Sequence, residues 1–118
     1  MSPATPAEFL LIKFLERVDA GGVFQGQGDG PGALAAFREA LGIGKRLAAQ
    51  DPANAGWQRD LAVSYCKLAQ IYHEQGKGTE TTQHLKLGRQ TLRGMKEMGM
   101  FLDPPLEELL KQLEVMDL

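Results

Sequence analysis

Apolar residues recur along this chain at intervals of three and four positions, which is the spacing of amphipathic helices. The clearest stripe consists of Trp57, Leu61, Tyr65, Leu68 and Tyr72. No segment alternates between apolar and polar residues as a strand does, and the strand-forming residues valine and isoleucine are scarce. We therefore predict an all-α chain.

Capping and turn residues divide this pattern into five helices. Thr5 and Glu8 form a capping box at the start of the first helix, which must end before the glycine-rich turn at 26–30. The four later helices, each bounded by its own start or stop signal, are expected over residues 31–50, 54–75, 79–98 and 103–118. The last of these is expected to run to the end of the sequence.

Two sets of apolar residues indicate how the first helices pack. Phe9, Ile12, Leu15 and Val18 share one broad apolar face of the first helix. Phe37, in the second helix, is predicted to be a buried anchor between the first three helices.

The chain also repeats itself. A shift of 48 residues superimposes equivalent positions of two units: Phe24 on Tyr72, Gln27 on Gln75, Gly28 on Gly76, and Gly21 on Ala69. Each unit is a helix, a glycine turn and a second helix. Two antiparallel helices pack closely only where a side chain is nearly absent, so Gly21 and Ala69 are expected at close helix contacts.

These units resemble the tetratricopeptide repeat (TPR) family, whose pattern is W-x2-L-G-x2-Y, a turn glycine, A-x3-F and a closing proline. The second unit reads Tyr65-x2-Leu68-Ala69-x2-Tyr72, then Gly76, then Thr81-x3-Leu85. The first unit reads Gly21-x2-Phe24, then Gly28, then Ala33-x3-Phe37, and finally Pro52. Pro52 comes late and the second unit has no closing proline, so the chain looks most like the long-repeat variants in kinesin-light-chain-like and bacterial signalling proteins.

The resemblance implies a short right-handed α-solenoid in a single domain, 1–118. Its parts would be two antiparallel TPR-like hairpins, 5–52 and 53–100, and a C-terminal helix, 103–118. Repeat arrays usually need at least three units. The fifth helix is therefore expected to cap the last apolar face, unless self-association or a longer parent chain covers it.

Charge and cysteine content narrow the classes of function. The formal net charge of −2 argues against a general nucleic-acid binder, which normally has a basic excess. The single cysteine, Cys66, cannot form an internal disulfide. The longest apolar stretch, 9–15, is interrupted by Lys13 and is too short to span a bilayer. We expect a cytoplasmic protein with neither a nucleic-acid nor a membrane partner.

Candidate catalytic residues are few, and we expect neither an enzyme nor a bound cofactor or metal. Ser64 does not lie in a G-x-S-x-G elbow. Cys66 lies mid-helix in a repeat position, which is typical of a half-buried, inert thiol. His73 and His84 lie on different helices without cysteine or carboxylate ligands at a suitable spacing, so they are interpreted as surface histidines.

The resemblance to TPR proteins indicates a binding surface. In that family, one face of the first helix in each hairpin lines a concave groove that holds extended peptides or partner helices. The matching positions here are Val18, Gly22 and Gln25 in the first helix and Val63, Cys66, Lys67, Gln70, His73 and Glu74 in the third. The same stripe is also compatible with a solvated face or one that a neighbouring repeat covers. The basic and asparagine residues of a chaperone-type carboxylate clamp are absent from these positions.

A second stripe on the fourth helix is basic: Lys86, Arg89, Arg93 and Lys96. Residues 77–96 contain five bases and one acid, whereas residues 103–118 contain five acids and one base. Three interpretations follow. The fifth helix docks partly by charge, an acidic partner binds the fourth helix, or the two faces are solvated and never meet.

Three classes of function remain. The first is a non-catalytic protein–protein interaction module, a scaffold or adaptor that holds a peptide or helix in the groove. The alternative is a structural or oligomerising module, or the terminal piece of a longer repeat array; the small number of repeats and the cluster Met95, Met98 and Met100 favour it. An enzyme or its regulatory subunit would require a pocket around His73 or Cys66 with a strongly perturbed pKa.

Overall fold

The computed structural model describes residues 5–118 of the chain. Its helices are α1 (Pro6–Gly26), α2 (Gly30–Gln50), α3 (Ala55–Glu74), α4 (Gly78–Glu97) and α5 (Pro104–Val115). No strand occurs within 5–118. The prediction of an all-α chain with five helices is confirmed.

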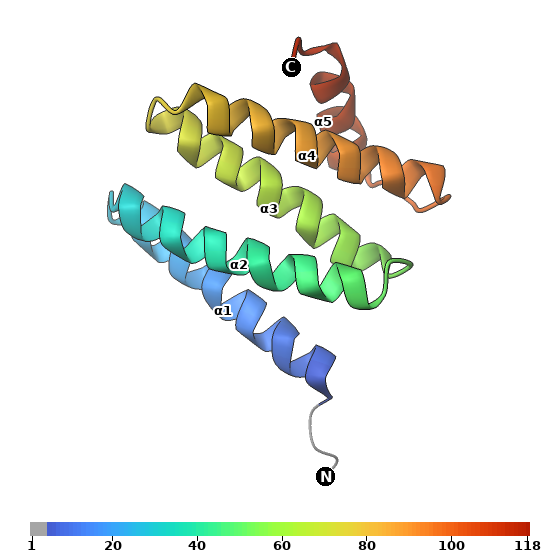
Figure 1. The fold of residues 1–118 in the computed structure, drawn as a ribbon, viewed down its shortest axis with the longest axis horizontal. Helices are drawn as coiled ribbons and strands as arrows, with labels where there is room; N and C mark the ends of the chain where they lie inside the picture. Colours follow the sequence, from blue (N-terminus) through green and yellow to red (C-terminus); the bar gives the residue numbers. More distant parts are fainter. Residues whose placement is uncertain (1–4) are drawn as a thin grey trace.

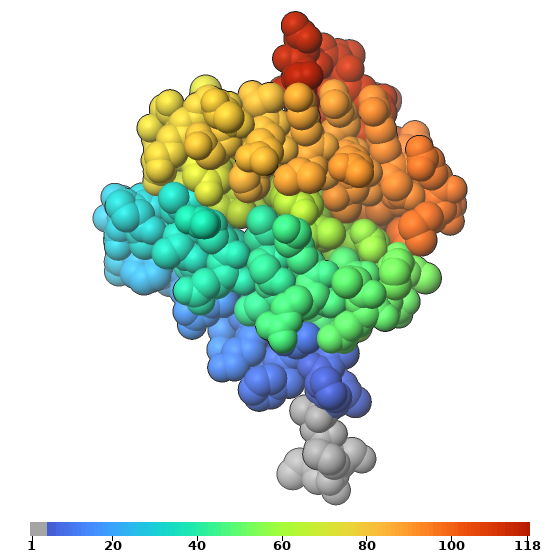
Figure 2. Space-filling model, in the orientation of Figure 1, coloured from blue at the N-terminus to red at the C-terminus, as the bar shows by residue number. Residues whose placement is uncertain are grey.

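The helices form two antiparallel hairpins, α1–α2 and α3–α4, which are joined by packing between α2 and α3 (Figure 1). The fifth helix packs on α4, and the described chain begins and finishes at opposite ends of the molecule (Figure 1). In the space-filling view of Figure 2, α2 and α4 form most of the visible face. No Cα atom of α1 lies within 8 Å of a Cα atom of α3, so these two helices flank α2 without touching through their backbones.

The two hairpin turns are equivalent, as the 48-residue repeat predicts. Gly28 and Gly76 have φ angles of 75° and 73°, in the left-handed region that glycine tolerates best. In the first turn the amide of Asp29 donates to the carbonyl of Phe24 (2.9 Å), and in the second the amide of Lys77 donates to that of Tyr72 (2.9 Å). This bond closes the end of each helix in the manner of a Schellman motif.

Side-chain caps set the starts of most helices. The capping box of α1 is present: the Glu8 amide donates to Thr5 Oγ1 (3.1 Å) and the Thr5 amide donates to Glu8 Oε2 (3.2 Å). Asp103 caps α5 through the amide of Leu106 (3.1 Å). The prediction that α5 reaches the end of the sequence was wrong, because the helix ends at the exposed residue Val115. Val115 and Met116 are 86% and 45% exposed, so another helical turn would gain little burial to offset the entropy lost in ordering it.

Phe37 is a buried anchor, as predicted. It belongs to a cluster shared by α2 and α3 that includes Leu68 and Tyr72, and its ring lies against Gly21 of α1. An alanine Cβ at Gly21 would lie 2.7 Å from Cε2 and Cζ of Phe37, closer than real Cβ contacts come. Gly21 therefore marks a close helix contact, and its repeat equivalent Ala69 is also buried.

Of the apolar face that the pattern indicates for α1, Val18 packs against the core but the other three residues do not. Phe9, Ile12 and Leu15 are 57%, 51% and 52% exposed, whereas Phe14 is buried. The ring of Phe14 lies over Gly44 of α2, where an alanine Cβ would be 3.4 Å from Phe14 Cε2. Because Gly44 leaves room on α2 for the Phe14 ring, the face of α1 that carries Phe14 is buried. The face that carries Phe9, Ile12 and Leu15 stays exposed.

A second core joins α5 to the hairpin of α3 and α4. Its buried members are Ala62 of α3, Leu92 and Met95 of α4, Leu102 of the α4–α5 connection, and Leu106, Leu110 and Leu113 of α5. The fifth helix thus covers an apolar face of α4.

Candidate functional site

An open groove of about 780 Å³ runs between α1 and α3. Its apolar lining includes Phe14, Leu15 and Val18 of α1, Phe37 of α2, and Val63 of α3. The groove exists because α1 and α3 both pack on α2 while their own backbones stay apart. Phe37 reaches it from α2, so the groove is closed on one side and open to solvent on the other.

Gly22 has no side chain, so the α1 backbone borders the groove directly at this position. A Cβ atom at this position would meet no heavy atom within 4 Å, in contrast to its neighbour Gly21. The exposed side chain of Val23 stands beside it on the same wall. An incoming side chain can therefore approach the α1 backbone at Gly22.

Five of the nine predicted groove residues line this groove: Val18, Gly22, Gln25, Val63 and Lys67. The other four, Cys66, Gln70, His73 and Glu74, are not among its lining residues. Cys66 lies instead against α4, where its Sγ would be 2.9 Å from a Cβ on Gly88. Gln70 and Glu74 hydrogen-bond to each other on the exposed surface (3.4 Å), and His73 is exposed.

The predicted stripe on α3 differs from the stripe that lines the groove both around the helix and along it. The lining residues of α3 are Arg59, Asp60, Val63, Ser64 and Lys67. Cys66 and His73 share a face that is turned away from the groove. Gln70 and Glu74 follow Val63 and Lys67 by seven residues, so they lie farther along the groove side of the helix. Asp60, Ser64 and Lys67 recur at intervals of four and three, and that spacing was the available signal for this face.

The charged residues of the groove differ in how they are paired. Arg59 forms an ion pair with Asp103 at the start of α5 (3.0 Å), and Lys67 Nζ lies over the ring of Phe37, 5.7 Å from its centroid. Asp60 and Asp19 form no ion pair within residues 5–118. Burial raises the pKa of the Asp60 carboxyl, and the charge of Arg59 opposes this in part.

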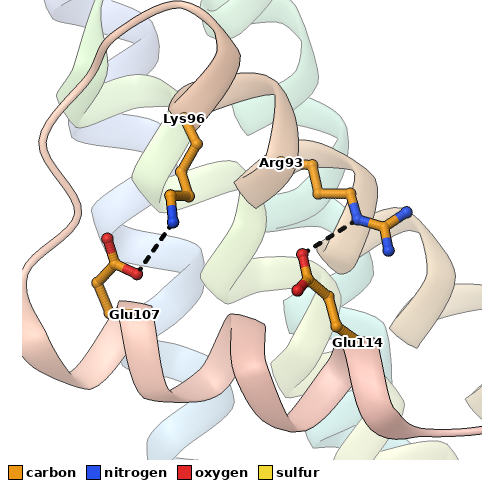
Figure 3. A network of polar contacts seen from close by, with 4 residues as sticks. All are labelled: Arg93, Lys96, Glu107 and Glu114. Atoms are coloured by element: carbon orange, nitrogen blue, oxygen red, sulfur yellow. Dashed lines mark hydrogen bonds and ion pairs between the residues drawn. The ribbon is translucent and has the colours of Figure 1, made fainter.

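The basic stripe of α4 meets α5 in part. Arg93 Nε donates to Glu114 Oε1 (3.2 Å) and Lys96 Nζ donates to Glu107 Oε2 (3.4 Å), as Figure 3 shows. Of the three interpretations, docking of the fifth helix partly by charge is therefore confirmed, and the one in which the two faces never meet was wrong. Each partly exposed pair contributes only about 0–1 kcal/mol, so the apolar core of α5 carries most of the docking energy.

The remaining bases of that stripe, Lys86 and Arg89, form no ion pair in the described part of the chain. Lys86 borders a shallow hollow of about 770 Å³ near the start of α4, together with Thr79 and Thr82. Two bases of this stripe, Arg93 and Lys96, thus pair with α5, and the other two are left without an ion pair within 5–118.

Of the candidate catalytic residues, only Ser64 lines the groove, and Cys66, His73 and His84 lie outside it. Burial raises the pKa of the Cys66 thiol to about 11, which disfavours the reactive thiolate. His84 is not a surface histidine, contrary to the sequence interpretation. Its ring centroid lies 5.0 Å from that of Tyr72 and 6.3 Å from that of Tyr65, and Nδ1 donates to the Glu80 carbonyl (2.8 Å).

Within 5–118 no three histidine, cysteine, aspartate or glutamate side chains are grouped so as to hold a metal ion. None of the helices there combines the length and the apolar character that crossing a bilayer requires.

The chain matches no protein-family model, no curated protein and no solved structure. The geometry of the groove is therefore the basis for a functional assignment.

Proposed function

We propose that this chain is a non-catalytic protein–protein interaction module, a TPR-like scaffold or adaptor that binds a peptide or helix of another protein between α1 and α3. The observation that carries this proposal is the set of large apolar side chains left in solvent on and beside the groove. Leu15, Val23 and Val63 line the groove and are between 44% and 58% exposed. Phe9 and Ile12 are exposed on the first two turns of α1, which precede the groove.

Such a surface is costly to leave uncovered. Complete burial of a leucine, valine or phenylalanine side chain is worth about 1.5–3 kcal/mol, so covering several of them together supplies substantial binding energy. Contiguous apolar patches on soluble proteins commonly mark interaction sites. The resemblance of the two hairpins to TPR units supports the same function, because that family uses this side of the molecule for binding. On this proposal the protein acts in the cytoplasm, and a bacterial source agrees with the repeat variant that it resembles.

Site-directed photocrosslinking tests the proposal in the native host. A photoreactive phenylalanine analogue at Val63 should give discrete adducts with a partner protein, whereas the same analogue at Ala49, an exposed position of α2, should not. Leu15→Ser should abolish the adducts from position 63, and Val115→Ser should leave them unchanged. Val115 is a matched control because it is an exposed aliphatic residue on α5. Equal adducts from both photoreactive positions, or none from either, would reject the groove as a binding site.

A second candidate function is an oligomerising module. The observation in its favour is the pair of exposed apolar residues at the α4–α5 connection, Met98 and Phe101, of which Phe101 is 80% exposed. Light scattering distinguishes this function from the first: an oligomerising module would associate with itself, and Phe101→Ser would dissociate it. A monomer at high protein concentration would remove this candidate.

A further inference from the structure

The basic side chains that line the groove contact partners within the protein, whereas the acidic ones form no ion pair within residues 5–118. Both bases already have a partner within the protein: Arg59 pairs with Asp103 at 3.0 Å, and Lys67 lies over the ring of Phe37. Both acids, Asp19 and Asp60, lack an ion pair within the described residues. Arg59 and Asp103 neutralise each other, whereas Lys67 keeps its positive charge beside the ring. The two acids and Lys67 therefore leave the groove with an excess of one negative charge.

Of these two acids, Asp60 would gain more from pairing with a cation. It is half-buried on α3, and burial raises the pKa of its carboxyl in spite of the nearby Arg59. The hydroxyl of Ser64 does not satisfy this carboxylate, because it donates instead to the backbone carbonyl of Asp60 (2.8 Å). A desolvated carboxylate without a partner gains most from an incoming cation.

The exposed face of α1 extends this negative character along the groove. Glu16 lies on that face between Ile12 and Val23, and it also forms no ion pair within 5–118. The surface thus places exposed apolar side chains beside free carboxylates, together with one base, Lys13, whose Nζ lies 5.6 Å from the centroid of the Phe9 ring. An amphipathic helix that carries bases beside its apolar row would complement both features.

We infer that the groove binds a basic amphipathic helix of another protein, whose lysine or arginine side chains pair with Asp19 and Asp60 while its apolar side chains cover Leu15 and Val63. This inference rests on the proposed function, because it specifies what the groove would hold. The α1 wall from Phe14 to Gln25 is about 17 Å long at 1.5 Å per residue, which corresponds to about three helical turns of the partner.

Charge also argues against the other occupants of such a groove. A second copy that inserted its own α1 would bring two carboxylates, Glu16 and Asp19, against one base without an ion pair within 5–118, Lys13, and the excess of like charge in the interface would cost binding energy. An anionic membrane surface or a nucleic acid would meet the same repulsion. The compensation pattern therefore favours a basic helical segment.

Two synthetic peptides of about 15 residues test the inference, a length that spans the groove with a short excess at each end. One has leucine and alanine on one helical face with lysine beside them, and the other has glutamate in place of each lysine. Fluorescence anisotropy of the labelled peptides measures their dissociation constants for the full chain. The lysine peptide should bind at least about tenfold more tightly, and its affinity should fall as salt is raised.

Three variants assign the binding to the groove. Asp60→Asn and Asp19→Asn should each weaken the lysine peptide by about two- to fivefold, as expected for a partly exposed ion pair. Glu97→Gln, which removes an exposed acid of α4 outside the groove, should leave the affinity unchanged. Leu15→Ser should weaken both peptides, because it removes apolar contact without a change of charge.

The outcomes separate this inference from the proposed function. Equal binding of both peptides, with Leu15→Ser weakening both, would overturn the basic partner but retain the groove as a binding site. Binding of the lysine peptide that is insensitive to both Asp60→Asn and Leu15→Ser would place it elsewhere and overturn both. Sedimentation of the free protein completes the test: a dimer that Leu15→Ser dissociates would make a second copy the occupant and overturn the inference. Failure of both peptides to bind would also overturn it.

Discussion

Gly21 and Gly22 are adjacent in α1, yet the structure predicts opposite effects when each is replaced by alanine. A Cβ at Gly21 would lie 2.7 Å from two ring atoms of Phe37, whereas a Cβ at Gly22 would meet nothing within 4 Å. Both glycines lie in the interior of a helix, where alanine is favoured over glycine by about 1 kcal/mol. The propensity gain is therefore the same at both sites, and only the contact with Phe37 differs.

The expected magnitudes follow from these two terms. Gly22→Ala should stabilise the protein by about 0.5–1 kcal/mol through helix propensity and the lower entropy of the unfolded chain. Gly21→Ala gains the same amount, but overpacking a buried contact costs about 1–3 kcal/mol. Leu68 and Tyr72 pack against Phe37, which is only 6% exposed, so its ring relieves the contact only in part by moving toward the groove that it borders. We expect Gly21→Ala to lower the free energy of unfolding by about 1 kcal/mol.

Urea denaturation followed by circular dichroism measures both free energies of unfolding. Phe37→Leu provides the internal check, because a smaller side chain makes room for the new methyl group. The cost of Gly21→Ala should shrink in the Phe37→Leu background, which is a positive coupling in a double-mutant cycle. If Gly21→Ala stabilises the protein as much as Gly22→Ala does, the close contact between α1 and α2 is refuted.

Two further predictions follow from the titration of buried groups. Burial raises the pKa of the Asp60 carboxyl, so the folded chain binds this proton more tightly than the unfolded chain does. The Asp60 carboxylate therefore lowers the free energy of unfolding as the pH rises from the ordinary aspartate pKa through the raised one. Asp60→Asn should therefore raise the urea midpoint at neutral pH and change it little at about pH 3; a lower midpoint at neutral pH would contradict this. The Cys66 thiol, with a pKa of about 11, should react slowly with a disulfide reagent at about pH 8, where about one thiol in a thousand is ionised, and rapidly after unfolding. Equal rates in the folded and unfolded protein would show that Cys66 is accessible.

The starts and turns of the helices were predictable because each depends on a few neighbouring residues. The capping box of Thr5 and Glu8 is completed within one helical turn. Gly28 and Gly76 take the left-handed conformation that a β-carbon disfavours, and the repeat in the sequence already showed that they are equivalent.

The candidate site was predictable only in part. The pattern identified the two helices that line the groove and five of its residues, but it placed Cys66 and His73 on the groove side of α3. It also did not single out Asp60, the half-buried acid on which the inferred charge preference rests. A stripe at helical spacing indicates that a face exists, but it does not say which neighbour that face meets.

The sequence by itself determined the number of helices, the caps of α1 and α5 and the equivalence of the two glycine turns, since local hydrogen bonds and backbone sterics decide these features. Only the tertiary structure decided which face of α1 is buried. Residues 9–15 are apolar except for Lys13, so helical periodicity leaves the choice open, and the fit of Phe14 over Gly44 and of Phe37 against Gly21 resolves it. The same packing leaves Leu15 in solvent and Asp60 without an ion pair within 5–118, because complementarity between distant segments depends on shapes and distances that spacing along the chain does not contain.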